Sequence, residues 1–271
     1  MALEPSARKA WTEDETILAL YLYFQTPFGR IHHRNPEIQK LAEALGRNSN
    51  SIAMKLANFA SLDPNIRNGG RTGLRGASNL DRELYARFAR DWDQLVDTAA
   101  QQWAKRLDAP SGTESSSRLH EARPEFRFES YAGPSVAEAV VVQRRGQDFF
   151  RRAVLANYAE ACCITGIAEP KLLVASHILP WGRDVGNRHN PANGVLLSGT
   201  MDKAFDQGLL TIEPSGKVLV SKRLLDHPNA PTRDYFSEFH ELPIRAAVRF
   251  DPDPTFLDWH NQHCFVDRLA A

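Results

Sequence analysis

Three polar residues in the C-terminal half of the chain are of types that hydrolytic chemistry can use. His177 ends a short apolar run, Asn193 precedes a second one, and Asp202 stands near the start of a helix-like segment. A neutral histidine, whose ordinary pKa is about 6.5, can take a proton from water near neutral pH. A carboxylate is a hard ligand that suits Mg²⁺ or Mn²⁺. A base and a divalent cation are what the hydrolysis of a phosphodiester needs.

The elements around these residues must bring strand ends and a helix together. The run over residues 172–175 has the apolar pattern of a strand and leads into His177. A second strand is expected over residues 195–197. The segment after it predicts a helix, on which Asp202 and Asp206 lie one turn apart on the same face.

Four motif blocks in this region, taken in order, resemble the HNH endonuclease family, whose nuclease unit has the ββα-metal fold. The blocks are Cys162-x-x-Thr165-Gly166, Ser176-His177-Ile178-x-Pro180-Trp181, Asn193-Gly194-x-x-Leu197-Ser198 and Phe205-Asp206-x-Gly208. The resemblance spans residues 140–225. Within the family, this segment is similar to bacterial restriction-like proteins with a C-terminal nuclease. The resemblance implies that His177 is the general base. It also implies that Asn193 holds the loop and the histidine in orientation without reacting.

The chain departs from the letters of the family at two positions. Asp202 lies nine residues after Asn193, where such domains usually place a histidine or asparagine on the helix. Ser176 stands where many relatives carry a metal-binding aspartate or histidine. The resemblance therefore implies one Mg²⁺ or Mn²⁺ ion held largely by Asp202, with Ser176 as a weaker ligand that water could replace. Asp206 is expected either to support the site or to cap the helix.

Simpler interpretations stand beside these roles. Asn193 begins an Asn-Gly dipeptide, which is common in turns, and Asp202 could only cap a helix. His189, in the loop between the two strands, could approach a phosphate. His260 and His263 have a spacing that a metal site could use, but no further paired ligands accompany them.

The first part of the chain predicts short helices with recognisable ends. Residues 12–15 form a capping box, Asn35 and Pro36 start a further helix, and Gly46 stops it. Residues 46–48 then have the length of the turn in a helix-turn-helix unit.

In such a unit the second helix enters the major groove of DNA. Its outward residues are predicted to be Asn50, Ser51, Lys55 and Asn58, which are suited to base edges and phosphates. The sequence Trp11-Thr12-Glu13 at the head of these helices also resembles the Myb/SANT type of DNA-binding module. The alternative is that the helices form a scaffold or a dimer interface.

Net charge does not indicate whether the protein binds nucleic acid, because 33 basic residues balance 33 acidic ones. The distribution of charge is more informative than the sum. Residues 25–80 contain eight lysines and arginines against three acidic residues, and Arg71 lies in a glycine-rich loop that could follow a phosphate backbone. A second basic cluster, at Arg144, Arg145, Arg151 and Arg152, precedes the nuclease-like region. Solvated helix faces are the alternative for both clusters.

We expect an α+β fold with two domains. Residues 108–133 are poor in apolar side chains and rich in serine, so they are predicted to be a linker. Residues 1–107 would then form a helical, helix-turn-helix-like DNA-recognition domain, and residues 134–271 the endonuclease domain. Long helices are predicted over residues 79–107 and 136–158.

Cysteine usage and hydropathy restrict the setting. The three cysteines, Cys162, Cys163 and Cys264, form no paired spacing, so neither a disulfide framework nor a structural zinc site is expected. No apolar run approaches the roughly 18 residues needed to span a bilayer. A soluble protein of a reducing cytoplasm fits these features.

The function expected from these features is a metal-dependent DNA endonuclease that acts in restriction, including restriction of modified DNA, on a double-stranded substrate. A single nuclease unit cuts one strand at a time, so cutting both strands favours a homodimer. Two alternatives stay open. One is a non-catalytic DNA-binding regulator with a degenerate HNH unit, and the other is a nicking or homing-type nuclease of a mobile element.

Overall fold

A computed structural model describes residues 9–68, 70, 73–107 and 134–269 of the chain. Helices dominate, and two short antiparallel sheets lie in the C-terminal half, so the α+β expectation is confirmed. Buried apolar side chains form two clusters, one in a helical unit and one around the sheets. None of the described helices is both long and apolar enough to cross a membrane. The predicted linker, residues 108–133, lies outside the described residues.

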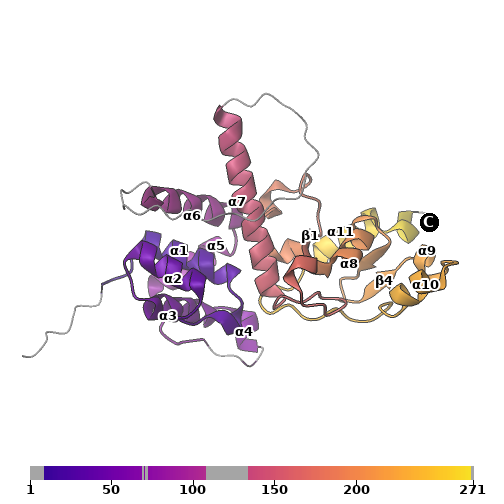
Figure 1. The fold of residues 1–271 in the computed structure, drawn as a ribbon, viewed down its shortest axis with the longest axis horizontal. Helices are drawn as coiled ribbons and strands as arrows, with labels where there is room; N and C mark the ends of the chain where they lie inside the picture. Colours follow the sequence, from indigo (N-terminus) through magenta and orange to yellow (C-terminus); the bar gives the residue numbers. More distant parts are fainter. Residues whose placement is uncertain (1–8, 69, 71–72, 108–133, 270–271) are drawn as a thin grey trace, which may run out of the picture.

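Six helices build the helical unit, at the indigo-to-magenta end of Figure 1. They are α1 (Glu13–Gln25), α2 (Pro36–Leu45), α3 (Ser49–Ala60), α4 (Pro64–Asn68), α5 (Asn79–Phe88) and α6 (Trp92–Leu107), with a short 3-10 turn, η1 (Phe28–Arg30). Thr12 and Glu15 form the predicted capping box of α1, and Asn35 caps α2. Gly46 ends α2 with a φ of 58°, a left-handed conformation that glycine adopts without strain.

Two details of these helices differ from the sequence prediction. The single helix expected over residues 79–107 is broken, because the carboxylate of Asp91 accepts a hydrogen bond from the Gln94 backbone at 2.9 Å and caps a new helix. The sequence favours Asn79 as the cap of α5 and Ser49 or Ser51 as the cap of α3. In the structure Ser78 caps α5, and Asn48 caps α3.

The nuclease-like unit follows α7 (Pro134–Asn157). Strand β1 (Leu173–His177) pairs with β2 (Gly194–Ser198), which leads directly into α8 (Gly199–Asp206). A second hairpin joins β3 (Leu210–Ile212) to β4 (Val218–Val220). The remaining elements are the 3-10 turns η2 (Pro170–Leu172), η3 (Val185–Asn187) and η4 (Pro191–Asn193), and the helices α9 (Lys222–Leu225), α10 (Ala230–Ser237), α11 (Pro254–His263) and α12 (Val266–Leu269).

Helix α7 joins the two units, and in Figure 1 it lies between them. Its neighbouring residues Phe149 and Phe150 belong to different cores: Phe149 packs in the helical unit and Phe150 packs beside the sheet. Successive residues on a helix point about 100° apart, so one helix can fill two cores at once. The division at residue 134 predicted from sequence therefore falls at the start of an element that both cores use.

A segment near residue 249 returns to the helical unit. Arg249 is buried, and its guanidinium donates hydrogen bonds to the backbone carbonyls of Tyr23 at 2.8 Å and Thr26 at 2.6 Å. These carbonyls lie at the end of α1, where helical hydrogen bonding stops, and the Tyr23 carbonyl also accepts from the Thr26 backbone at 3.2 Å. Phe250 packs next to it against the ring of Trp92, with ring centroids 5.2 Å apart.

Candidate active site

The hairpin of β1 and β2 brings the predicted site residues to one place. In its antiparallel register His177 lies opposite Gly194, and Ser176 lies opposite Val195. Neighbouring side chains on a strand point to opposite faces. Ser176 accordingly faces α8, where its hydroxyl donates a hydrogen bond to the carboxylate of Asp202. His177 faces α7.

The imidazole of His177 is held on two sides. It stacks on the ring of Phe150, with centroids 3.7 Å apart and planes 10° apart, and meets the ring of Trp181 edge-on at 5.3 Å. Its Nε2–H donates to the backbone carbonyl of Arg188 at 2.9 Å. A carbonyl can only accept, so Nε2 carries the proton and Nδ1 keeps its lone pair. No described residue makes a hydrogen bond with Nδ1, so this atom is free to accept a proton.

Burial determines the protonation state of this histidine. Desolvation lowers the pKa of His177, and nearby His189 acts in the same direction, although the hydrogen bond to Arg188 opposes them. A lowered pKa keeps the ring neutral, and therefore basic, at physiological pH.

A second buried histidine offers a useful contrast. His260 on α11 also stacks on a phenylalanine, Phe205, with centroids 3.7 Å apart. Its Nδ1 is hydrogen-bonded to the hydroxyl of Thr211 at 2.8 Å, and burial lowers its pKa to about 4. Both histidines are therefore stacked and buried. They differ at Nδ1, which has a hydrogen-bond partner in His260 and none among the described residues in His177.

Asn193 ties together the loop that follows β1. Its side-chain oxygen accepts a hydrogen bond from the Leu179 backbone at 2.8 Å, and its amide donates to the carbonyl of Asn187 at 3.1 Å. It lies at the end of η4 with 1% of its surface exposed, and its backbone carbonyl accepts from Ile178 at 2.9 Å. The side chain therefore links both ends of the loop that contains Arg188.

The carboxylates of Asp202 and Asp206 lie one turn apart on α8 and line the same cavity. Partial burial and the neighbouring Asp202 carboxylate raise the pKa of Asp206, while Lys203 acts in the opposite direction. Like charges held close together favour binding of a cation between or beside them. The oxygen donors of Asp202, Asp206 and Ser176 suit Mg²⁺ or Mn²⁺, which keep several water ligands, better than zinc.

A cavity of about 330 Å³ connects these groups. Among the residues that line it are Ser176, His177, Trp181, Asp202, Asp206 and His260. Within the described part of the chain, no group of three or more His, Cys, Asp or Glu side chains is arranged to hold a metal ion. The donor set thus fits an ion held by two carboxylates and water, and not a closed cage of protein ligands.

Two glycines of the motif blocks are explained by close packing. A Cβ atom at Gly194 would lie 2.6 Å from Val154 and 2.7 Å from Phe150, so only glycine lets α7 approach the hairpin. Gly208 has a φ of 64°, and a Cβ there would lie 1.9 Å from the Cys264 carbonyl. Gly194 thus lets α7 pack on the hairpin of β1 and β2, and Gly208 lets the end of α11 pack on the turn between α8 and β3.

The predicted DNA-contacting residues of α3 are only partly available. Asn50 is exposed, and Ser51 and Asn58 are half-buried. The prediction that Lys55 faces outward is wrong, because its side chain is 4% exposed and its ammonium lies 2.5 Å from the carboxylate of Asp81. An ammonium buried in such a pair is not available to a phosphate.

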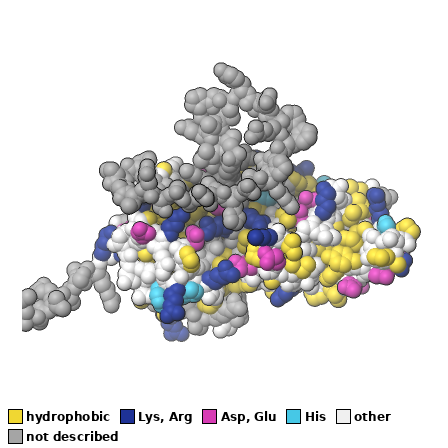
Figure 2. All heavy atoms as spheres, viewed as in Figure 1, with side chains coloured by type: hydrophobic (Ala, Val, Ile, Leu, Met, Phe, Trp, Pro, Cys, Tyr) yellow, Lys and Arg dark blue, Asp and Glu magenta, His cyan; other side chains and the backbone are white. Residues whose placement is uncertain are grey.

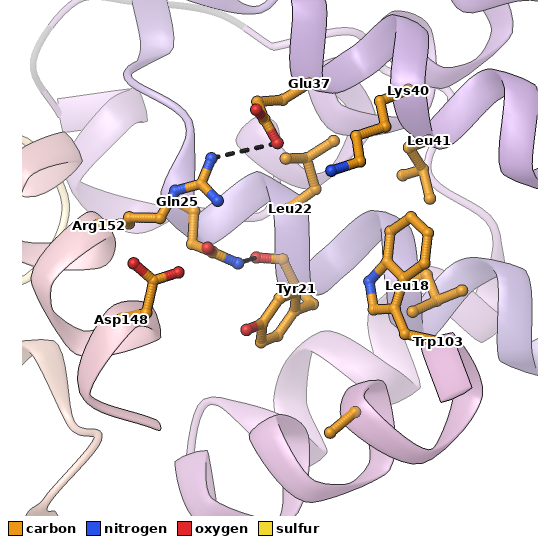
Figure 3. A pocket seen from close by; sticks show the side chains of 11 residues that line it. Leu18, Tyr21, Leu22, Gln25, Glu37, Lys40, Leu41, Trp103, Asp148 and Arg152 are labelled. Atoms are coloured by element: carbon orange, nitrogen blue, oxygen red, sulfur yellow. Dashed lines mark hydrogen bonds and ion pairs between the residues drawn. The ribbon is translucent and has the colours of Figure 1, made fainter. Parts of the chain in front are cut away.

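The basic cluster on α7 also makes contacts within the protein. The guanidinium of Arg151 donates to the carbonyls of Leu173 at 2.9 Å and Pro170 at 3.1 Å. Arg152 forms an ion pair with Glu37 at 3.3 Å, at the edge of a cavity of about 380 Å³ between α1, α2, α6 and α7 (Figure 3). Arg71 and the side chains of residues 144 and 145 lie outside what the structure describes.

On the face shown in Figure 2, lysine and arginine side chains lie over both units and are interspersed with acidic ones. Charge on this face is therefore mixed, in keeping with the balanced total.

Three residues that orient His177 have no role in the prediction from sequence. Phe150 supplies the stacking surface, Trp181 the edge contact, and Arg188 the carbonyl acceptor. Phe150 and Trp181 are aromatic residues beside motif blocks, which is a usable signal. A backbone carbonyl that accepts a hydrogen bond leaves no signal in the sequence, because every residue carries a carbonyl.

Comparison with known proteins supports the site. Residues 162–213 match the family model described as HNH endonuclease, so the resemblance seen in the motif blocks is confirmed for this segment. The matched segment contains β1, β2, α8 and β3 and thus His177, Asn193 and Asp202. No curated protein matches the chain. The match supports nuclease activity in general.

Proposed function

We propose that the chain is a metal-dependent endonuclease that hydrolyses DNA phosphodiesters, with His177 as the general base. The observation that carries this proposal is the state of His177. The ring is neutral, its Nε2–H is fixed by the Arg188 carbonyl, and its Nδ1 lone pair has no partner among the described residues. A base must present such a lone pair within a cavity that a substrate can reach.

In the proposed reaction Nδ1 of His177 accepts a proton from water as the water oxygen forms a bond to phosphorus. The bond between phosphorus and the 3′ oxygen breaks at the same centre, and this oxygen takes up a proton to become a hydroxyl. The products are a 5′-phosphate and a 3′-hydroxyl. Asn193 acts on this step only through position, because its hydrogen bonds hold the loop that carries the Arg188 carbonyl.

A divalent ion, Mg²⁺ or Mn²⁺, would be held by Asp202 and water, with Ser176 and Asp206 beside it. Such an ion would stabilise the charge that develops on the phosphate and on the leaving oxygen. The hydrogen bond from Ser176 fixes the carboxylate of Asp202 toward the cavity. Asp206 contributes negative charge one turn away.

The helical unit would select the DNA. Helices α2 and α3 are joined at Gly46 by a short turn, and Asn50 at the start of α3 is exposed. A helix-turn-helix of this kind would place Asn50, Ser51 and Asn58 toward base edges. The setting we propose is restriction of double-stranded DNA, including modified DNA, by a homodimer that cuts both strands.

Cleavage of supercoiled plasmid tests the proposal. Unmodified and cytosine-methylated plasmids would be incubated with Mg²⁺, with Mn²⁺ or with a chelator. We expect metal-dependent cutting by the wild type and by His33→Ala, which removes an exposed histidine of the helical unit, and none by His177→Ala. A preference between the plasmids would identify the modification. Tight DNA binding without cutting in either metal would instead indicate the regulator with a degenerate HNH unit.

The pH dependence of the rate gives an independent check on the base. Because burial lowers the pKa of His177, the rate should fall to half of its maximum only below the ordinary histidine pKa of about 6.5. A rate that halves near or above the ordinary histidine pKa of about 6.5 would contradict a buried base.

A further inference from the structure

A pair of side chains connects the helical unit to the loop of the nuclease site. Nδ1 of His189, in the loop between β1 and β2, lies 2.5 Å from a carboxylate oxygen of Asp93 on α6. The two residues are 96 positions apart in the chain. Their side chains are largely shielded from water, with 13% of His189 and 33% of Asp93 exposed.

Asp93 is fixed by the core of the helical unit. It lies in the first turn of α6, where the partial positive charge of a helix N-terminus favours a carboxylate. The residue before it, Trp92, is buried and packs against Phe24 and Phe250 at centroid distances of 4.6 and 5.2 Å. The carboxylate is therefore presented to the loop from a rigid support.

His189 is enclosed on its remaining sides. Its ring meets that of Trp181 edge-on at 5.6 Å. Its Nε2 is buried without a hydrogen-bond partner among the described residues, and a Cβ atom at Gly146 of α7 would lie only 2.0 Å from it. The Asp93 carboxylate lies at hydrogen-bond distance from Nδ1 on one side of the ring, and α7 packs against Nε2 on the other.

Two routes lead from His189 to the proposed base. The residue before it, Arg188, supplies the carbonyl that accepts from Nε2–H of His177. Trp181, which meets His189, also meets the ring of His177 at 5.3 Å. Displacing His189 would therefore move the Arg188 carbonyl, which sets the tautomer of His177. It would also move Trp181, which packs against the ring of His177.

We propose that Asp93 and His189 are positioning residues through which the helical unit holds His177 in its reactive tautomer and orientation. This inference rests on the proposed function, since it assigns a purpose to that same site. It makes catalysis depend on a contact between the two units, in addition to any DNA contacts that the helical unit makes.

The first test compares cleavage by Asp93→Ala, Asp93→Asn and the wild type in the full chain. Asp93→Ala should lower kcat by about 10- to 100-fold with KM for DNA changed less than about twofold, as expected when orientation and not binding is lost. Asp93→Asn keeps an oxygen acceptor and should recover most of the rate. Glu13→Gln is the matched control, because Glu13 pairs with Arg87 at 3.6 Å within the helical unit and does not contact the loop.

A second variant approaches the ring from its other side. Gly146→Ala improves the helix propensity of α7 but places a methyl group where Nε2 of His189 lies. It should lower kcat while leaving the thermal midpoint of unfolding close to that of the wild type. Gly29→Ala, with no atom within 4 Å of its new Cβ, is the control and should leave kcat unchanged.

Nitrogen NMR of histidine-labelled protein supplies a readout that does not need activity. In the wild type His177 should be the Nε2–H tautomer, and in Asp93→Ala its nitrogen shifts should move toward the average of two tautomers. Unchanged shifts and an unchanged kcat in Asp93→Ala and Gly146→Ala would overturn the inference. Altered shifts in a protein whose wild type cuts no DNA would sustain the coupling and reject the nuclease proposal.

Discussion

Charged groups are arranged differently in the two units of this protein. In the helical unit two buried pairs join charges of opposite sign: Lys55 lies 2.5 Å from Asp81, and Arg47 lies 2.6 Å from Glu15, whose pKa falls to about 2. In the nuclease cavity Asp202 and Asp206 lie near each other. Matched charges maintain a structure, while groups left unmatched are available to a ligand or a reaction.

The largest effect is expected where a matched pair is broken. Lys55→Met leaves the carboxylate of Asp81 buried without its cation and should lower the free energy of unfolding by about 3–5 kcal/mol. Chemical denaturation measures this directly.

The same pair can be removed as a whole. Adding Asp81→Asn to Lys55→Met eliminates the buried charge and keeps an oxygen for the hydrogen bond that Asp81 accepts from the Ser78 backbone at 2.9 Å. The double variant should regain most of the lost stability. If it is as unstable as Lys55→Met alone, the loss comes from packing on Trp11 and not from the unpaired charge.

Removing a charge from the unmatched pair should have the opposite effect on stability. Asp202→Asn should reduce metal-dependent cleavage by about 100-fold or more, because a hard ligand is lost. In metal-free buffer it should be at least as stable as the wild type, since repulsion with Asp206 is relieved. A variant that lost both activity and stability would mean that Asp202 is a structural residue, held by Ser176 for folding alone.

The buried His260 should make the stability of the fold sensitive to acid. His260 stays neutral in the folded state down to about pH 4, whereas in the unfolded chain it takes up a proton near the ordinary pKa of about 6.5. Its contribution to stability is therefore complete above pH 6.5 and is lost as the pH falls toward 4. Between pH 7 and 5 the wild type should lose about 2 kcal/mol more than His260→Gln. His263→Gln, three residues away and exposed, should follow the wild type.

The smallest effect is expected for an exposed pair between the units. Arg152 and Glu37 are 37% and 46% exposed, so Arg152→Ala should cost less than about 1 kcal/mol. The neighbouring Arg151→Ala should cost about 1–3 kcal/mol, because two backbone carbonyls lose a charged donor. An equal loss of unfolding free energy in the two variants would show that side-chain exposure does not determine how much each arginine stabilises the fold.

Local features of this fold could be predicted from the sequence. The capping box at Thr12, the stop at Gly46 and the order of two strands and a helix around His177 depend on residues near one another in the chain. The HNH match covers the same strands and helix. Local structure of this kind requires particular residue types at fixed spacing, so it can be predicted from the sequence.

Contacts between distant segments could not be predicted in this way. Nothing near Lys55 in the sequence indicates that Asp81 will bury it, and nothing near His189 indicates Asp93. The break at Asp91 was missed because apolar periodicity continues through it, although the aspartate that caps α6 is a usable signal. Which side chain meets which across two cores depends on how helices pack, and a single sequence does not contain this information.

The hydrogen bonds from Arg249 to the end of α1 have a consequence for the order in which the protein matures. A ribosome releases the helices of the first unit early, but the group that satisfies the Tyr23 carbonyl is synthesised 226 residues later. Until then the Tyr23 carbonyl has the Thr26 backbone N–H as a partner but lacks the guanidinium. The helical unit therefore reaches its final stability only after the nuclease site has been made. A nascent or truncated chain would lack a fully formed helical unit.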